Sequence, residues 1–178
     1  MVFLSDDIIT LRAVEPADLD LFYKWENDTA LWDMAPTIAP FSRELLRAYI
    51  ESYVADIYAD KQLRLMVTLT ASGITIGTVD ITDFDPINRR AAIGILIDDA
   101  YRGHGYGLRA VNLACSYCEQ RVGMHQLWAS VAADNEPSLR LFTSAGFRRY
   151  GRLRSWIRRG RTYADAYTMQ KLFSGDSH

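Results

Sequence analysis

The stretch that decides the fold is ILIDDAYRGHGYGLRA, residues 95–110. It begins in an apolar run typical of a buried strand, ends in a segment with helical spacing, and has glycines at positions 103, 105 and 107 in the loop between them. The first amides of a helix have no partners inside the helix, and the helix dipole favours anions at this end. Because glycines let a ligand approach the backbone closely, the loop predicts a cradle for a pyrophosphate group.

Two other phosphate-binding motifs do not fit this loop. The Walker motif requires Gly-Lys-Ser/Thr, whereas Gly107 is followed by Leu108 and Arg109. The dinucleotide fingerprint requires Gly-x-Gly-x-x-Gly with an acidic residue about 20 positions later, and GHGYG has a different spacing. Taken alone, the loop could also be a flexible turn before a helix.

The segments on either side of the loop predict an α/β (α+β) fold, in which helices flank one twisted mixed sheet. Alternating polarity and β-branched residues predict strands at residues 8–14, 63–69, 74–82, 91–97, 127–132, 147–157 and 162–172. Apolar residues at helical spacing predict helices at residues 15–27, 42–58, 105–121 and 135–145. We expect Ser42 to cap the second helix and Gly146 to end the last one. Residues 31–41, LWDMAPTIAPF, have two prolines and no clean period, and predict an ordered loop.

Composition and charge limit the class of function. The chain has 178 residues, of which 49% are hydrophobic, so we expect one domain over residues 1–178 with a frayed end at 174–178. A net charge of −2 argues against nucleic acid or an anionic membrane as a partner. Seven arginines lie between Arg148 and Arg161, and we interpret them as part of a solvated face.

The two cysteines, Cys115 and Cys118, lie in an apolar helical run, and no second pair exists to complete a metal site. We therefore expect them to pack in the core and expect no bound metal. Two cysteines, no signal-like start and no apolar run of about 18 residues are typical of a reduced, cytoplasmic protein.

Two segments resemble a known family. The run RGHGYG at residues 102–107 resembles the Gln/Arg-x-x-Gly-x-Gly/Ala acetyl-CoA signature of the GNAT N-acetyltransferases. The run ADNEPSLRLFTSAGF at residues 133–147 resembles the Asn-x-x-Ser/Ala…Gly-Phe segment of that superfamily, most nearly in its ribosomal-protein and spermidine acetyltransferase branch. The resemblance extends over nearly the whole chain. It implies a GNAT-type fold, acetyl-CoA as cosubstrate and direct transfer of its acetyl group to a primary amine.

The resemblance also implies which residues contact the cofactor. The backbone at residues 95–97 would pair with the pantetheine arm as an extra strand does, and the amides at residues 102–107 would hold the pyrophosphate. Asn135 would contact the pantetheine or acetyl region with Ser138 nearby, although Asn135 could instead only cap its helix. For His104 we expect a backbone contact and a solvent-facing ring rather than a catalytic base. The full set is Ile95, Leu96, Ile97, Arg102, Gly103, His104, Gly105, Tyr106, Gly107, Asn135, Ser138 and Phe142.

The acid and base of the reaction do not stand at the family's positions. Acyl transfer needs a neutral nitrogen, whereas an amine with a lysine-like pKa near 10.4 is mostly protonated at pH 7. Where relatives have a strand acid and a tyrosine that protonates the thiolate, this chain has Ala92 and Phe142. We expect Asp80 to accept the proton, while Asp83 and Asp85 could serve only the turn. The alternative is catalysis by orientation and by backbone N–H groups near residues 95–97.

Three functions stay open at this point. The first is acetylation of a small amine such as a polyamine or diamine, with Trp32 and Asp33 as an aromatic wall and a cation partner for the acceptor. The second is acetylation of a protein N-terminus or lysine, in which the acceptor is a peptide amine. The third is a CoA-binding regulator without turnover. Exposed aromatic or sheet surfaces would also permit a homodimer.

Overall fold

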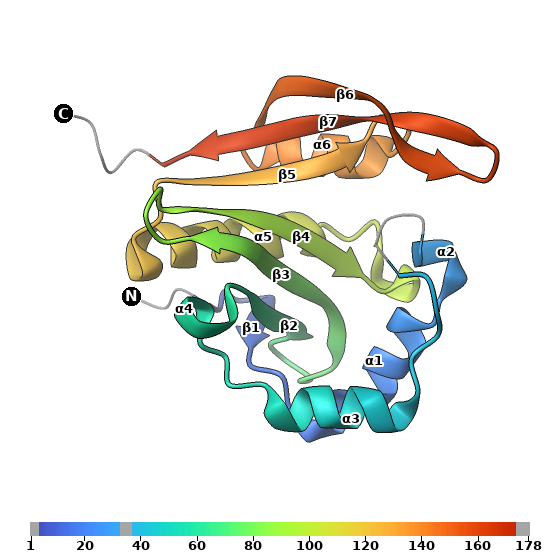
Figure 1. Ribbon diagram of the computed structural model, residues 1–178. Helices are drawn as coiled ribbons and strands as arrows, with labels where there is room; N and C mark the ends of the chain where they lie inside the picture. The colour runs from blue at the N-terminus through green and yellow to red at the C-terminus, as the bar shows by residue number, and fades with distance from the viewer. Residues whose placement is uncertain (1–3, 33–36, 174–178) are drawn as a thin grey trace.

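The structure, a computed structural model, describes residues 4–32 and 37–173. Its central element is a seven-stranded sheet in the order β1-β2-β3-β4-β5-β7-β6 (Figure 1). The strands are β1 (Ile9–Arg12), β2 (Leu63–Leu69), β3 (Thr75–Asp85), β4 (Arg90–Ile97), β5 (Gln126–Ala132), β6 (Arg148–Arg159) and β7 (Thr162–Leu172). All neighbouring strands are antiparallel except β4 and β5, which are parallel. The prediction of a mixed sheet is confirmed.

Helices cover both faces of this sheet. The α-helices are α1 (Leu19–Glu26), α2 (Thr29–Trp32), α3 (Arg43–Ser52), α4 (Ile57–Asp60), α5 (Tyr106–Tyr117) and α6 (Glu136–Ser144). Short turns of 3-10 helix at Pro16–Asp18 and Asp99–Tyr101 precede α1 and the glycine loop, and a π-helical turn, Cys118–Val122, continues α5. The main core lies under α5, and a smaller core of Phe22, Trp25, Leu46, Ile50 and Met66 lies under α1 and α3.

The alternation of side chains along β3 separates the two faces. Val79 and Ile81 are fully buried in the main core. Asp80, between them, must point to the opposite face, where α1 and α3 pack. The strand register places Arg64 of β2 and Gly94 of β4 on either side of Asp80. These three residues form one row across the sheet, on the face away from α5.

Strands β4 and β5 pair only where they begin. Their pairing runs from Arg90, opposite Gln126, to Ala92, opposite Trp128, and stops there. The remainder of β4 keeps its antiparallel partner β3 as far as Ile97 but separates from β5, as Figure 1 shows. The end of β4 therefore presents a strand edge to which an extended ligand can add hydrogen bonds.

The prediction of one helix over residues 42–58 is wrong in its second half. The helix begins as expected, because the Ser42 side chain accepts a hydrogen bond from the amide of Leu45 at 3.1 Å. It ends at Ser52, and Tyr53 has an extended backbone with its hydroxyl 2.5 Å from the amide nitrogen of Arg64. This contact with β2 takes Tyr53 out of the helix. A separate helix, α4, then begins after Asp56, which is its N-cap.

Other boundaries differ from the predictions by a few residues, among them those of α2 and β3. Helix α2 includes the first two residues of the segment 31–41, for which the sequence predicts a loop. Strand β3 continues to Asp85, which also accepts hydrogen bonds from the amides of Ile87 and Asn88 in the following turn. Asp83 and Asp85 thus belong to the strand end and its turn, as the turn interpretation indicates.

Candidate active site

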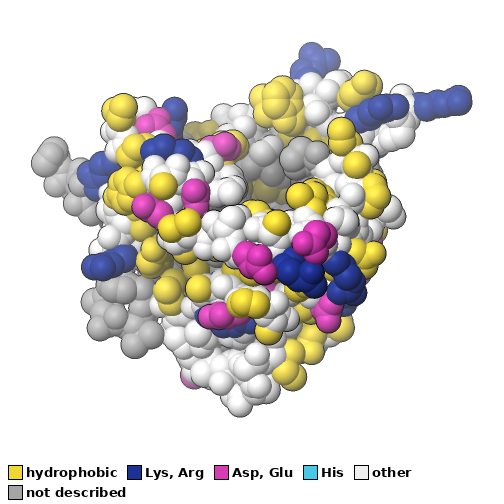
Figure 2. Space-filling view, turned by 60° about the horizontal axis from the view of Figure 1, so that its bottom comes forward, with side chains coloured by type: hydrophobic (Ala, Val, Ile, Leu, Met, Phe, Trp, Pro, Cys, Tyr) yellow, Lys and Arg dark blue, Asp and Glu magenta, His cyan; other side chains and the backbone are white. Residues whose placement is uncertain are grey.

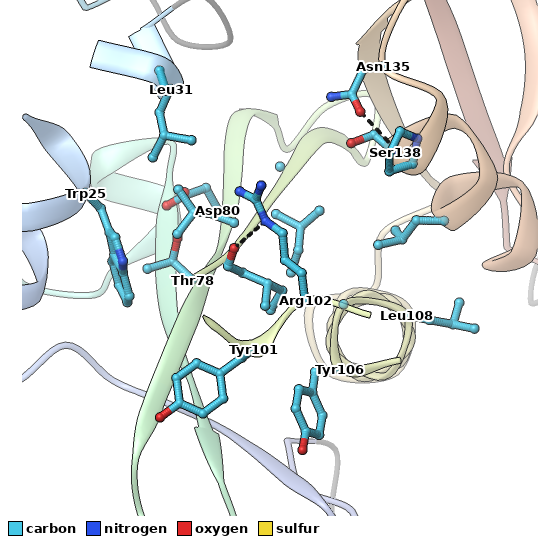
Figure 3. A pocket seen from close by; sticks show the side chains of 18 of the residues that line it. Trp25, Leu31, Thr78, Asp80, Tyr101, Arg102, Tyr106, Leu108, Asn135 and Ser138 are labelled. Carbon is cyan, nitrogen blue, oxygen red and sulfur yellow. Dashed lines mark hydrogen bonds between the residues drawn. The ribbon is translucent and has the colours of Figure 1, made fainter. Parts of the chain in front are cut away.

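A cavity of about 950 Å³ opens between the end of β4 and the helices around it. Its lining comes from α1 and α2 on one side, from β2, β3 and β4 at its floor, and from the glycine loop and α6 on the other side. Figure 3 shows these side chains arranged around a common space. Most of the residues singled out by the two sequence motifs line this cavity, namely Ile95, Leu96, Ile97, Arg102, Gly103, Gly105, Tyr106, Gly107, Asn135 and Ser138.

The glycine loop borders the cavity and leads directly into α5. Gly103 and Gly105 have φ angles of +81° and +80°, a region that residues with a side chain rarely adopt. A Cβ atom at either position would meet no protein atom within 4 Å, so each glycine borders open space. Gly105 is the N-cap of α5 and has no side chain to cap the helix, so the first amides of α5 are left for an external anion.

Gly107 serves a different purpose from the other two glycines. A Cβ atom at this position would lie 2.7 Å from Cδ1 of Leu141 in α6. The absence of a side chain therefore lets α5 approach α6 closely. This approach brings the start of α6, with Asn135 and Ser138, to the same cavity as the loop.

Arg102 adds a positive charge to the cavity wall beside the glycine loop. Its Nε donates a hydrogen bond to the carbonyl oxygen of Ile97 at 2.9 Å, and its Nη1 lies 2.6 Å from a carboxylate oxygen of Asp99. The side chain thus folds back over the end of β4 and faces the cavity (Figure 3). A guanidinium beside uncapped helix amides is a suitable partner for a phosphate group.

At the start of α6, the helix-cap interpretation of Asn135 is confirmed. Its side-chain oxygen accepts a hydrogen bond from the amide of Ser138 at 3.2 Å, drawn as a dashed line in Figure 3. Both residues line the cavity as well. Asn135 thus caps α6 and borders the cavity at the same time.

Two residues of the motif-based set have side chains outside the cavity lining. The His104 ring is exposed, stacks on Tyr106 with ring centroids 5.6 Å apart, and lies with Nδ1 3.3 Å from the carbonyl oxygen of Tyr101. Phe142 is only 4% exposed, belongs to the main core and packs edge-on against Phe147. The structure therefore places the Phe142 ring among apolar side chains rather than with the other motif residues.

Three charged side chains from α1, β2 and β3 meet in another part of the cavity wall. Arg64 donates from Nε to one carboxylate oxygen of Asp80 at 2.5 Å and from Nη2 to the other at 3.3 Å. Its Nη1 donates to Glu26 at 2.8 Å. Burial would lower the pKa of Arg64, but the carboxylates of Asp80 and Glu26 outweigh it and raise that pKa, so the guanidinium stays charged. All three residues line the cavity, and Figure 3 shows Asp80 facing it from β3.

The sequence alone points to Asp80 but not to Arg64 or Glu26. Residues 26, 64 and 80 come from α1, β2 and β3, and only the strand register and the packing of α1 bring them together. A signal is present in β2, where Arg64 is a charged residue in the run LRLMVTL. A charge in an apolar strand that is mostly buried needs a partner, so it indicates a paired or functional site.

A buried carboxylate ties α1 to the glycine loop. Asp98 follows β4 and accepts hydrogen bonds on Oδ2 from Lys24 Nζ at 2.5 Å and from Trp25 Nε1 at 2.9 Å. Its Oδ1 accepts a third, from the amide of Ala100 at 3.2 Å. Burial raises the pKa of Asp98, but the three hydrogen bonds outweigh it, so the pKa lies below its ordinary value. These bonds hold the Trp25 indole in the cavity wall.

Of the two predicted acceptor residues, Trp32 is the last residue of α2. Trp32 lines the cavity, and its indole nitrogen donates a hydrogen bond to the carbonyl oxygen of Glu26 at 2.9 Å. Asp33 lies outside the described residues. This bond ties Trp32 to the backbone at the end of α1, where the side chain of Glu26 pairs with Arg64.

The cysteines pack in the core as predicted. Both are buried, and burial raises the pKa of Cys115 to about 11, so this thiol stays protonated at neutral pH. Within residues 4–32 and 37–173, no group of three or more His, Cys, Asp or Glu side chains could hold a metal ion. Over the same ranges, no helix is long and apolar enough to cross a membrane.

Comparisons with known proteins identify a family and similar sequences. Residues 9–148 match the model of the acetyltransferase (GNAT) domain. The spermidine N(1)-acetyltransferase of Escherichia coli (strain K12) is 25% identical over 146 residues, which are 82% of this chain and 75% of that protein. The protein of the same name from Vibrio cholerae is 26% identical over 148 residues, 82% of each chain.

The fold is also found in solved structures. A dodecameric structure of spermidine N-acetyltransferase from Vibrio cholerae has a TM-score of 0.76 at 26% identity and covers 92% of this chain and 93% of that one. The structure of the Vibrio cholerae enzyme in complex with CoA and spermine has a TM-score of 0.82 at 24% identity, covering 92% and 95% of the two chains. The mixed sheet with its flanking helices is thus the fold of these proteins.

Proposed function

Since the family model matches residues 9–148, the chain belongs to the acetyltransferase (GNAT) domain family, and from this premise we propose that it acetylates the primary amine of a small molecule such as a diamine or polyamine. By its family, the chain is an acetyl-CoA-dependent N-acetyltransferase. The observation that carries the acceptor class is the pair of carboxylates, Glu26 and Asp80, in the cavity wall. Relatives named as spermidine N(1)-acetyltransferases support a cationic amine as the acceptor.

On the cofactor side, the proposed contacts use mostly backbone. The amides around Gly103–Gly107 and the guanidinium of Arg102 bind the pyrophosphate, and the free edge of β4 at Ile95, Leu96 and Ile97 pairs with the pantetheine arm. Acetyl-CoA supplies an activated acetyl group as a thioester. Backbone N–H groups at this edge polarise its carbonyl, and Asn135 and Ser138 border the same space. All of these elements belong to the one sheet and its helices, and we propose that they act as one catalytic domain.

On the acceptor side, Asp80 is the proposed proton acceptor. The incoming ammonium must lose a proton before its nitrogen can attack the carbonyl carbon. Of the two Asp80 oxygens, Oδ2 has the longer contact with Arg64, 3.3 Å against 2.5 Å for Oδ1. The oxygen that Arg64 holds more weakly is the better placed to accept this proton and pass it to solvent.

The reaction ends when the C–N bond has formed and the C–S bond breaks. The nitrogen releases its second proton to water, the sulfur leaves as a thiolate, and the Phe142 side chain has no proton to give to the sulfur. A thiol of ordinary acidity, with a pKa near 8.5, is a good leaving group at neutral pH, so water can supply this proton. The proposed mechanism therefore needs a base and orientation but no acidic side chain.

The experiment that tests this function is thiol release from acetyl-CoA, with each product identified by mass spectrometry. Putrescine, spermidine, an amino sugar and a peptide with a free N-terminus serve as separate acceptors. We expect rapid release with a cationic amine and a product carrying one added acetyl group. Release with the peptide alone would mean that the acceptor is a protein amine and not a small amine. No release with any acceptor, while CoA still raises the melting temperature, would favour a CoA-binding regulator.

We also propose that the chain forms a homodimer or a larger assembly. Tyr150, Trp156 and Tyr163 on β6 and β7 are each 61% exposed, which is high for large aromatic side chains. Figure 2 shows Lys and Arg side chains projecting beside hydrophobic ones at the end of the molecule where Figure 1 places this hairpin. The Vibrio cholerae relative described as dodecameric supports self-association. Light scattering coupled to size-exclusion chromatography measures it, and a monomer at all concentrations would contradict it.

A further inference from the structure

The charges of the acceptor cluster do not cancel. The cluster contains two carboxylates, of Glu26 and Asp80, and one guanidinium, of Arg64, so its net charge is −1. The three side chains are 26%, 27% and 24% exposed, so solvent screens them only in part. A ligand that enters the cavity therefore meets one uncompensated negative charge at this place.

The other charged residues of the lining are balanced by neighbours. Arg102 pairs with Asp99 at 2.6 Å, and Arg159 pairs with Asp134 at 3.3 Å. Arg140 lies 3.8 Å from Glu136 in the same helix. Over the described part of the lining, the unbalanced charge thus lies at the acceptor cluster.

Arg64 is a fixed part of this cluster rather than a mobile surface group. Three hydrogen bonds hold its guanidinium, which also lies over the Phe22 ring, 5.2 Å from its centroid. Its backbone amide and carbonyl both contact the Tyr53 hydroxyl. A cationic ligand therefore binds beside Arg64 rather than in its place, because both groups carry the same charge and Arg64 is already oriented.

The row of Arg64, Asp80 and Gly94 across the sheet leaves room for an amine next to this cluster. Gly94 stands opposite Asp80 on β4, and a Cβ atom at Gly94 would meet no protein atom within 4 Å. A small amine can lie over Gly94 with its reacting nitrogen at the β4 edge. Any second ammonium on the same molecule then lies close to Glu26, Arg64 and Asp80.

We propose that Arg64 sets the charge of the preferred acceptor, so that the enzyme selects a diamine over a monoamine and over longer polyamines. This inference rests on the proposed function. Once the reacting nitrogen has lost its proton and Asp80 has passed that proton to solvent, a diamine keeps one positive charge, which matches the net charge of −1. Spermidine keeps two and spermine three, so these acceptors bring further ammonium groups near Arg64 without a carboxylate to balance them.

The wild-type enzyme gives the first test. We measure kcat/KM for butylamine, putrescine, spermidine and spermine, which keep none, one, two and three positive charges in this state. We expect kcat/KM for putrescine to exceed that for butylamine and that for spermidine by about 10-fold each. This is the size of effect that one unmatched charge near a partly buried ion pair would have. A rise in kcat/KM from putrescine to spermine would overturn the charge proposal.

Two variants shift the cluster charge in opposite directions. Arg64→Met changes the net charge to −2, and the preferred acceptor should move to spermidine. Glu26→Gln changes it to 0, and the preferred acceptor should move to butylamine. The control is Arg47→Met, which removes an arginine that pairs with Glu44 on α3 outside the cavity lining and should leave the order unchanged. A general loss of structure would lower all rates together, so opposite shifts in preference cannot come from misfolding.

The outcomes separate this inference from the proposed function. If the wild type acetylates amines but both variants keep its order of preference, Arg64 does not set acceptor charge and the small-amine function still stands. If the wild type acetylates none of the four amines, the proposed function fails and the inference fails with it. If Arg64→Met does not fold, the shift of Glu26→Gln towards butylamine remains a sufficient test, because this isosteric change leaves the guanidinium bound to Asp80.

Discussion

On the proposed cofactor side of the cavity, backbone groups make most of the proposed binding surface: the amides of the glycine loop, the start of α5 and the edge of β4. On the proposed acceptor side, charged side chains from α1, β2 and β3 make this surface. Backbone sites depend on chain conformation, which a few glycines determine locally. Side-chain sites depend on residues that only the folded register brings together. The first kind can serve every enzyme that uses the same cosubstrate, whereas the second kind can change with the acceptor.

The largest expected effect is a loss of catalytic rate in a variant of the proposed acceptor side that keeps its CoA affinity. Asp80→Asn removes the proposed proton acceptor, and we expect kcat to fall about 100-fold or more, the usual contribution of a general base. CoA affinity, measured by titration calorimetry, should stay within about 2-fold because no cofactor contact is proposed for Asp80.

A matched control for this variant is present on the same strand. Asp85 also lies on β3, is also 27% exposed and also pairs with an arginine, Arg90 at 3.3 Å, but it does not line the cavity. Asp85→Asn should leave kcat near the wild-type value. Equal losses in both variants would mean that the loss at Asp80 reflects stability rather than proton transfer.

The second expected effect tests the proposed binding of CoA by backbone groups of the glycine loop. Gly105→Ala places a methyl group in the open space beside the loop and strains a backbone with φ of +80°. We expect CoA affinity to fall about 10- to 100-fold, the equivalent of one or two lost charge-assisted hydrogen bonds. Calorimetric titration with CoA measures this change without any acceptor.

Gly73 provides the control for backbone strain. It lies in the turn between β2 and β3, has φ of +70° and also borders open space, but it is not part of the cavity lining. Gly73→Ala should cost about 1–2 kcal/mol of stability, as at Gly105, and leave CoA affinity unchanged. A similar affinity loss in both variants would contradict the cradle.

A smaller effect concerns the link between the two sides. The folded pKa of Asp98 lies below its ordinary value, so its carboxylate stabilises the fold above about pH 4, and this stabilisation is lost as the pH falls through the lower folded pKa. We expect Asp98→Asn to lose about 1–3 kcal/mol at pH 7 and to show a flatter decline of stability below about pH 4. Urea unfolding at several pH values measures both, and an unchanged slope would mean that Asp98 does not contribute to acid sensitivity.

The smallest effect is expected for Phe142→Tyr, which restores the residue type of the family at this position. Because the ring is 4% exposed and packs against Phe147, the new hydroxyl would enter the apolar core. We expect a loss of about 1–3 kcal/mol in unfolding free energy and no gain in kcat. A clear gain in kcat at unchanged stability would show that the ring edge reaches the leaving thiolate.

Local signals predict the cofactor side well. The change from strand alternation to helical spacing across the glycine loop is enough to locate β4, the loop and α5 from the sequence. Asn135 can be located in the same way, because a helix cap and its amide partner are only three residues apart. Such features depend on neighbours in the chain, so they can be derived from the sequence.

Other features depend on contacts between distant residues. The end of α3 depends on the hydrogen bond between the Tyr53 hydroxyl and the backbone of β2, whereas the apolar spacing alone continues the helix past it. The partners of Asp80 come from residues 26 and 64, which no local pattern connects. The burial of Phe142 depends on its packing against the chain that follows α6. None of these contacts can be derived without the fold.

Three consecutive residues of α1 contact both sides of the cavity. Lys24 and Trp25 bind Asp98 at the base of the glycine loop, and Glu26 binds Arg64 in the acceptor cluster. A displacement of this single helical turn is therefore transmitted to both substrate sites. If acetyl-CoA binding moves it, the affinity for the amine changes by some factor, and thermodynamic linkage requires the amine to change the affinity for acetyl-CoA by the same factor. Helix α1, which carries no sequence motif, is thus the element through which the binding of one substrate would change the affinity for the other.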